Sequence, residues 1–562
     1  MMNNYEIAHN LSMLAKLMDI HGENSFRSKT YSIAAYNIEK NIVEVNTLPL
    51  EKIFSMQGIG DAIAKKIIEL LQTGKIKSLE DLFNKTPPGV LEMLNIKGIG
   101  PKKISIIWKE MSIENIGELL YACHENRLLL YKGFGKKTQD NVIEAIQFYE
   151  QQQGNYLYAK VEELGKELTA YLQNIFSNKQ VEITGAFKRH AETLSMLEFV
   201  VPESPVNIIK VLKKLSEFNL LDQNDDYLLY HYDEKIKIKL FLTDEESLNE
   251  KLFSTSATEE FMEAFSRQFS PIDFRKAAND EDIFKALKIQ HIPCFLREDA
   301  EIITFAKDFS IPDVIQPRDI KGLIHCHSNW SDGSNTLEQL AAAALDSGLE
   351  YLVISDHSKA AYYAKGLSEE QIKAQHELVD ELNKKYKPFK IFKSIESDIL
   401  NDGNLDYSNS ILSTFDLVIA SVHSNLKMSQ EKAMARLLKA IENPYTAILG
   451  HMTGRLLLSR SGFPVDHKKI IDACAANSVV IELNAHPRRL DMRWQWIDYA
   501  LQQNVLISIN PDAHSTEEFS NTRYGVLAAQ KGKLTKKDNL SSYSLNEFED
   551  FLEGVKKKRT NI

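Results

Sequence analysis

The chain has 562 residues, of which 43% are hydrophobic and 26% are charged, so it is too long for a single core and too apolar to be disordered. Its formal net charge of −11 excludes a protein that attracts nucleic acid over its whole surface. Residues 1–150 are neutral, with 18 Lys and Arg against 18 Asp and Glu, so an anion-binding site in this third would have to be local.

The N-terminus lacks a basic segment followed by an apolar one, and no apolar run is long enough to cross a membrane. We therefore predict a cytoplasmic protein. The four cysteines are scattered without pair spacing, which favours free thiols in a reducing compartment over disulfides or a cysteine-based zinc site. They are Cys123, Cys294, Cys326 and Cys474.

The first third has helical periodicity and contains a repeated Gly-apolar-Gly motif between apolar helical segments. The copies are Gly58-Ile59-Gly60, Gly98-Ile99-Gly100 and Gly133-Phe134-Gly135, and lysines follow each of them. Two glycines allow a tight turn, and the free amide groups at the next helix N-terminus can bind a phosphate. One copy alone could be an ordinary turn between helices, but three copies favour a binding motif.

The repeat resembles the helix-hairpin-helix motif of DNA repair proteins. That resemblance implies DNA binding through the phosphate backbone, without reading of base sequence. The predicted DNA-binding residues are Gly58, Gly60, Lys66, Gly98, Gly100, Lys102, Gly133, Gly135 and Lys136.

Upstream of the first copy, residues 22–36 (GENSFRSKTYSIAAY) resemble the start of the N-terminal domain of family X DNA polymerases. In that family this domain grips the 5′ phosphate of a DNA gap. Lys66 falls where some members carry a Schiff-base lysine that removes 5′ deoxyribose phosphate. We interpret Lys66 as an exposed helix lysine or a phosphate contact, with lyase chemistry as the less favoured alternative.

Residues 185–200 (GAFKRHAETLSMLEFV) resemble the palm motif of the same polymerase family, but the residues that carry its chemistry are replaced. Two-metal nucleotidyl transfer requires carboxylates that bridge both ions. We therefore predict a polymerase-shaped scaffold that does not polymerise and that holds DNA or docks the neighbouring domains. The lost polymerase positions are Ala186, Met196, Glu198 and Lys239.

From residue 320 onward, short β-rich runs alternate with helical stretches, which predicts βα units around a parallel sheet or barrel. Metal-competent side chains follow these runs, and the C-terminal ends of parallel barrel strands converge on one face. One site would therefore collect His325, His327, Asp332, His357, Glu396, His423, His451, Asp512 and His514.

Mixed imidazole and carboxylate ligands suit Mn²⁺, Zn²⁺ or Fe²⁺ better than Mg²⁺. Two or three such ions would activate a water for hydrolysis of a phosphoester. Glu396 is the expected bridging ligand, because one carboxylate can offer an oxygen to each of two ions. The predicted catalytic residues are Glu396, Asp512 and His514.

The order of these nine residues resembles the polymerase and histidinol phosphatase (PHP) domain, and all nine ligand positions of that family are filled. The resemblance implies a distorted (β/α)7 barrel with a metal cluster. Together with the preceding regions it extends over most of the chain, which resembles bacterial PolX, a family X polymerase fused to a PHP nuclease. Arg455, Arg489 and His486 are weaker candidates for binding phosphate or substrate.

The predicted fold is therefore multidomain, α+β and α/β. We predict an N-terminal helical DNA-end-binding domain, further helix-hairpin-helix repeats, a nucleotidyltransferase-like palm and thumb, and the PHP barrel. Their predicted bounds are 1–90, 91–153, 154–310 and 318–562.

The favoured function is a DNA-repair 3′-5′ exonuclease and phosphoesterase that hydrolyses DNA with a metal-activated water. Its partner would be gapped, nicked or 3′-end DNA, and its cofactors two or three Mn²⁺ and/or Zn²⁺ ions, with Fe²⁺ as an alternative. Three other hypotheses stay open: a bifunctional polymerase and exonuclease, a small-molecule phosphatase of the histidinol-phosphatase type, and a DNA-bridging scaffold without enzymatic activity.

Overall fold

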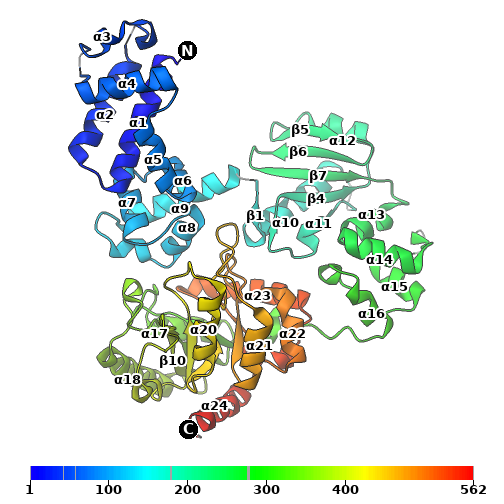
Figure 1. The fold of residues 1–562 in the computed structure, drawn as a ribbon. Helices are drawn as coiled ribbons and strands as arrows, with labels where there is room; N and C mark the ends of the chain where they lie inside the picture. The colour runs from blue at the N-terminus through cyan, green and yellow to red at the C-terminus, as the bar shows by residue number, and fades with distance from the viewer. Residues whose placement is uncertain are drawn as a thin grey trace. The chain divides into compact units, whose positions relative to one another are not determined.

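The computed structural model describes residues 2–41, 43–56, 58–152, 154–177, 180–274, 277 and 279–560. The chain divides into two compact units (Figure 1), one of residues 1–124 with 128–149 and one of residues 125–127 with 150–562. The four predicted domain bounds stay a prediction, and residue 153, the predicted end of the second domain, lies outside the described residues.

The first unit is helical. Asn3 and Glu6 form a capping box that begins its first helix, and Gly22 ends that helix in a left-handed conformation. The helices are α1 (Asn4–His21), α2 (Ser25–Glu39), α3 (Leu50–Ile53), α4 (Asp61–Thr73), α5 (Lys77–Lys85), α6 (Pro88–Glu92), α7 (Pro101–Lys109), α8 (Ile116–His124) and α9 (Lys136–Gln152).

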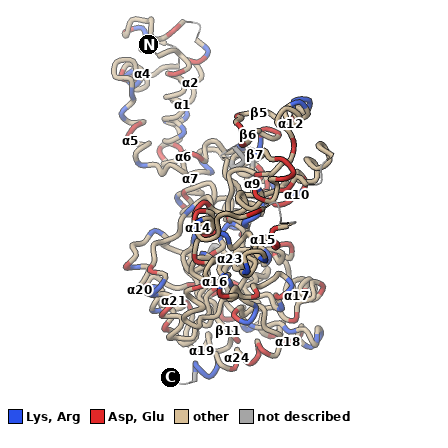
Figure 2. Tube along the Cα trace, turned by 90° about the vertical axis from the view of Figure 1, so that its right-hand side faces the viewer, with Lys and Arg blue, Asp and Glu red and all other residues tan. Residues whose placement is uncertain are grey.

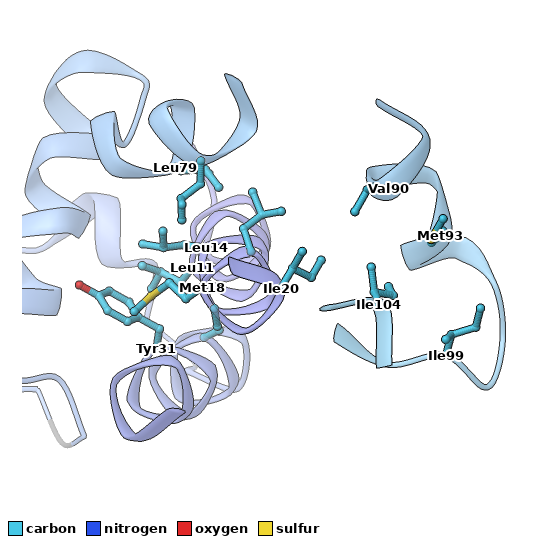
Figure 3. Packing of buried hydrophobic residues seen from close by; sticks show 14 of the residues in the cluster. Leu11, Leu14, Met18, Ile20, Tyr31, Leu79, Val90, Met93, Ile99 and Ile104 are labelled. Atoms are coloured by element: carbon cyan, nitrogen blue, oxygen red, sulfur yellow. The ribbon is translucent and has the colours of Figure 1, made fainter. Parts of the chain in front are cut away.

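Helix α1 forms the centre of this unit, because it packs against α2, α5 and α7. Its apolar residues face in more than one direction (Figure 3): Leu14 and Met18 lie in the core near α2 and α5, and Ile20 lies toward Ile104 of α7. The two parts that hold the first and second hairpins therefore share one continuous hydrophobic core.

The second unit begins with a five-stranded sheet in the order β2-β4-β7-β6-β5, in which only the pair β4 and β7 is parallel. Helices α13 to α16 follow and enclose an aromatic core. The elements are β1 (Tyr156–Leu157), α10 (Tyr158–Ile175), β2 (Glu182–Thr184), α11 (Gly185–Lys188), β3 (Thr193–Leu194), β4 (Met196–Val201), α12 (Pro205–Leu212), β5 (Phe218–Gln223), β6 (Tyr227–Tyr232), β7 (Ile236–Leu242), α13 (Leu248–Thr255), α14 (Glu259–Phe269), α15 (Asp280–Leu287) and α16 (Glu301–Lys307).

The rest of the second unit confirms the predicted barrel. Strands β8 to β14 form a parallel sheet in sequence order, and a bridge from Cys326 to Ala513 brings its two edges together. The elements are β8 (Gly322–Cys326), α17 (Leu337–Asp346), β9 (Tyr351–Ile354), α18 (Glu369–Lys385), β10 (Lys390–Asp398), α19 (Asn409–Leu412), β11 (Leu417–Ser421), α20 (Gln430–Ile441), β12 (Thr446–Leu449), α21 (His467–Ala476), β13 (Val480–Asn484), α22 (Ile497–Gln502), β14 (Ile507–Asn510), α23 (Thr522–Lys531) and α24 (Leu545–Thr560).

Helix α24 covers the N-terminal ends of the barrel strands. Phe548 stacks on Tyr351, the first residue of β9, with ring centroids 4.4 Å apart, and Arg559 donates to the carbonyl of Phe415 just before β11. This apolar cluster includes residues of β8 to β13. Apolar side chains therefore fill this end of the barrel, and the predicted polar site is expected at the opposite end.

None of the described helices combines the length and the apolar character that a membrane span requires. The predicted cytoplasmic location stays a prediction.

Candidate metal centre

The nine predicted ligands lie at or just after the C-terminal ends of the barrel strands. Eight of them are buried and His423 is partly buried. His325 lies in β8 and is followed by His327 and Asp332, while His357 follows β9 and Glu396 lies in β10. His423 follows β11, His451 follows β12, and Asp512 and His514 follow β14.

Two histidines at alternate positions of a regular strand would share one face, but the backbone is not regular at His325 and His327. The pairing of β8 with β9 shifts between Leu323 and Cys326, and His325 has a φ of 65°. Asp512 also has a positive φ, of 53°. Such conformations are costly for residues with a Cβ and are concentrated at functional sites.

Three groups of these side chains could each hold a metal ion. Within each group, the ligand atoms all lie within 4.8 Å of one another. In the part of the chain that the structure describes, all such groups lie in the barrel. The groups are His327 with Asp332, His357 and His514; His325 with His327 and Asp512; and His357 with Glu396 and His423.

Glu396 is central to the site because its two oxygens face different imidazoles. Its Oε1 lies 3.0 Å from Nε2 of His451 and 3.1 Å from Nε2 of His423. Its Oε2 lies 3.0 Å from Nδ1 of His357 and 3.7 Å from Nε2 of His327. The structure thus brings all nine predicted ligands together, since His451, outside the three groups, reaches the cluster through Glu396.

Burial disfavours the charged form of each group, but neighbouring imidazoles and carboxylates offset that effect. His357 and His514 hold the pKa of Asp332 well below its ordinary value, and Asp332 raises the pKa of His514 to about 10. Burial and the neighbouring His514 and His357 instead lower the pKa of His327 to about 4. His327 is therefore a neutral imidazole, the form that binds a metal.

Glu482, which was not among the predicted residues, lies in β13 and is fully buried. Its carboxylate lies 2.6 Å from Nδ1 of His325 and accepts a hydrogen bond of 3.0 Å from the amide of His451. Carboxylates of this kind orient metal-binding histidines. The available signal was a carboxylate inside the apolar run Val480-Ile481-Glu482-Leu483, where an unpaired charge would be costly.

The loop between His327 and Asp332 is held by Asp356. The Asp356 carboxylate accepts hydrogen bonds from the amide of Ser328 at 2.8 Å and from Oγ of Ser331 at 2.5 Å. It also accepts one of 2.6 Å from Gln375 of α18. These contacts fix the backbone that presents two of the predicted ligands.

The three weaker candidates lie in different surroundings. The Nε of Arg489 lies 3.7 Å from Oδ2 of Asp512, and His486 lies in the same segment with its amide bonded to Asn484. The guanidinium of Arg455 instead binds the carboxylate of Glu192 and the carbonyl of Leu490. Arg489 therefore lies beside the candidate metal cluster, whereas Arg455 is committed to a protein contact.

The palm-like sheet has no comparable cluster among the described residues. Glu198 of β4 pairs in register with Lys239 of β7. The Glu198 carboxylate accepts a hydrogen bond of 3.2 Å from the amide of Ala186, and the Lys239 ammonium lies 4.3 Å from the ring centroid of Tyr227. The ammonium group of Lys239 thus stands next to Glu198, where a site for two metal ions would need a further carboxylate.

The three predicted hairpins have the same backbone geometry. The first glycine of each copy has a φ between 80° and 95°, and the apolar residue after it is buried. The second glycine precedes helix α4, α7 or α9, and no side chain caps α4 or α7 in the described structure.

The predicted DNA-binding lysines differ in exposure. Lys102 and Lys136 are exposed, whereas Lys66 is half-buried and pairs with Glu69 at 2.7 Å. Basic and acidic residues alternate along this unit (Figure 2).

Comparison with known proteins gives matches over most of the chain. Residues 2–76 match the helix-hairpin-helix domain, residues 90–147 a SAM-like helix-hairpin-helix tandem, and residues 324–486 the PHP domain. The DNA polymerase/3'-5' exonuclease PolX of Bacillus subtilis is 28% identical, over 98% of this chain and 99% of its own length. A probable phosphatase of Thermoanaerobacter sp. is 23% identical, over 42% of this chain and 95% of its own length.

Proposed function

Because the chain is a homologue of PolX with helix-hairpin-helix regions and a C-terminal PHP domain, we propose that it is a metal-dependent phosphoesterase that degrades DNA from 3′ ends during repair. The observation that carries the proposal is the buried cluster of nine imidazoles and carboxylates around Glu396. Our assignment of these nine residues as ligands belongs to the same proposal.

The side chains themselves fit divalent metal ions. Several buried ligand atoms have no hydrogen-bond partner in the described part of the chain, among them Nδ1 of His327, Oδ2 of Asp332, Oε2 of Glu396 and Nε2 of His514. Unsatisfied buried polar atoms are rare, and metal coordination is one way to satisfy them. The mixture of nitrogen and oxygen donors favours Mn²⁺ or Zn²⁺.

Bound metals would lower the pKa of a water and stabilise the charge that develops on the phosphate. The residues of the chain supply the arrangement. Glu396 is placed between two sets of imidazoles, Glu482 holds the ring of His325 in one orientation, and Arg489 can offer its guanidinium to a phosphate oxygen. The strand termini fix the ligands in advance, so little reorganisation is needed during hydrolysis.

In the proposed function, the three hairpins bind the DNA. Their N-terminal amides and the lysines beside them bind phosphates without reading bases. This mode suits a protein that recognises gaps, nicks or 3′ ends in any sequence.

The direct test is digestion of gapped, nicked and 3′-phosphate DNA with Mn²⁺ by the full-length protein and by His325→Ala. We expect the substitution to abolish digestion. His467→Ala is the matched control, since His467 stacks on Trp496 with ring centroids 4.7 Å apart and is not one of the nine residues. Equal digestion by His325→Ala and the unmodified protein would refute the proposal.

Two alternatives can be tested with the same proteins. Relatives named as probable phosphatases match part of this chain, so turnover of a small phosphate monoester should be compared with turnover of DNA. Primer extension by the His325→Ala variant tests a surviving polymerase. The pairing of Glu198 with Lys239 leads us to expect no extension.

A further inference from the structure

Among the described residues of the second unit, three ion pairs join the palm-like region, which comprises residues 156–307, to the barrel of residues 322–560. Arg523 binds Glu162 through two hydrogen bonds, Lys531 binds Glu298, and Arg455 binds Glu192. Two of the basic residues, Arg523 and Lys531, lie on α23, which carries none of the nine cluster residues. The third pair differs because Arg455 lies shortly after His451, one of the nine cluster residues, in the sequence.

Arg455 is buried against the palm-like region, with 5% of its side chain exposed. Its two terminal nitrogens lie 2.7 and 3.2 Å from the two carboxylate oxygens of Glu192. One of them also donates to the carbonyl of Leu490. Bidentate pairs of this kind fix direction as well as distance, which a single contact between charges does not.

The backbone on either side of Arg455 belongs to the loop that begins at His451. The amide of Gly454 bonds to the carbonyl of His451 at 2.9 Å. Asp491 accepts hydrogen bonds from the amide of Thr453 at 3.0 Å and from its Oγ1 at 2.9 Å. The loop after β12 is therefore fastened to the segment around Leu490.

That second segment also reaches the metal centre. It includes Arg489, which lies beside Asp512, and its Arg488 carbonyl accepts a hydrogen bond of 2.6 Å from the amide of Leu457. A single guanidinium thus connects Glu192 with the two loops that present His451 and Arg489.

We propose that Glu192 is a positioning residue for the metal centre, and that the palm-like region acts as a brace for the barrel loops in place of polymerising DNA. Glu192 acts through Arg455 and does not touch the cluster itself. Its loss would leave a buried guanidinium without its carboxylate, which is strongly unfavourable. The loop would then relax and move the imidazole of His451 away from Glu396.

The test is a Co²⁺ titration followed by visible absorption, with the full-length metal-free protein and no DNA. For Glu192→Gln we expect at least one site to bind Co²⁺ about tenfold more weakly, as is typical when a supporting contact is lost, with a changed absorption band. Glu162→Gln is the matched control. It breaks another ion pair of the same interface, and its basic partner Arg523 lies on α23, which carries none of the nine cluster residues. Equal titrations for both variants, whether changed or unchanged, would overturn the proposal.

A second pair of variants covers the case in which Glu192→Gln does not fold. Glu192→Asp keeps the charge but shortens the side chain, and we expect the same weakening in smaller degree. Reversing the pair in Glu192→Arg/Arg455→Glu should restore part of the Co²⁺ affinity that Arg455→Glu alone loses. An absence of any restoration would contradict direct action through this pair.

The catalytic consequence rests on the proposed function and is measured separately. With saturating Mn²⁺, Glu192→Gln should lower kcat on DNA more than it raises KM, because the DNA-binding hairpins are unchanged. If the unmodified protein does not digest DNA, the proposed function fails while the Co²⁺ titration still decides the positioning role.

Discussion

The palm-like sheet and the barrel both place polar side chains on adjacent parallel strands, yet among the described residues only the barrel gathers a cluster that could hold metal ions. In the sheet, β4 and β7 pair in register and bring Glu198 beside Lys239. In the barrel, the strand ends bring nine imidazoles and carboxylates together around Glu396. Strand geometry is therefore available in both places, and the side chains decide which one can hold metals.

The difference shows that the fold of the sheet does not depend on which polar residues stand on its strands. The sheet is stabilised by an apolar core that includes Leu197, Phe199 and Ile238, on which the neighbouring polar positions have little effect. Exchanging a carboxylate for a thioether or an ammonium at a strand face costs little stability, whereas it removes the charge that two metal ions need.

The largest effect should come from Glu396→Gln, which keeps the size of the side chain but removes the charge shared by five imidazoles. We expect phosphodiester hydrolysis with Mn²⁺ to fall by at least about 1000-fold, because metal stabilisation of the transition state amounts to several kcal/mol. Glu350→Gln, at the other end of the barrel, should keep full activity. Similar rates for the two variants would mean that the barrel cluster is not the reactive site.

The next effect should come from Glu482→Gln, which removes the charge facing Nδ1 of His325. We expect metal affinity to fall by about 10–100-fold, the usual effect of losing a partner that orients a ligand. Calorimetric titration with Mn²⁺ measures this directly. Unchanged Mn²⁺ affinity would show that metal binding depends on the nine predicted residues and not on a supporting carboxylate.

Much of this site was predictable because each ligand follows a strand-like run. The positions of His357, His423 and His451 could be inferred from that rule alone. The positive φ of His325 could not, because it depends on a shift in pairing between two strands. Glu482 was also missed, although it is a carboxylate inside an apolar run, and so was the contact of Arg455 with Glu192. The pairing of His325 with Glu482 spans 157 residues and that of Arg455 with Glu192 spans 263, so neither partner could be identified from local sequence.

The protonation of the cluster gives a third prediction, about the metal-free protein. Despite burial, Glu396 and Asp398 raise the pKa of His423 to about 9, and Asp332 raises that of His514 to about 10. A raised pKa contributes stability that is fully present below pH 6.5 and is lost as the pH rises through 9 and 10. Each of the two groups contributes about 1.4 kcal/mol per pH unit, so we expect the free energy of unfolding to fall by about 3 kcal/mol per pH unit between pH 7 and 9.

The measurement is urea unfolding followed by tryptophan fluorescence in a Trp108→Phe background, so that the remaining tryptophans report on the barrel. The metal-loaded protein is the control, because its coordinated imidazoles are neutral and add no such pH dependence. Equal slopes with and without metal would show that these histidines are not ion-paired in the metal-free state.

The smallest effect concerns the helical unit, which we expect to bind DNA without cutting it. Gly98 has a φ of 93° and an open space where a Cβ would lie, so Gly98→Ala introduces backbone strain without a clash. The strain of about 1 kcal/mol should turn the hairpin away from the phosphate and weaken binding to gapped DNA about fivefold. Gly74→Ala is matched to it, because Gly74 has a φ of 76° and equal space but ends α4 and is not part of a hairpin motif. Weaker binding in both variants would assign the effect to general destabilisation, whereas a loss confined to Gly98→Ala would place phosphate contacts at the start of α7.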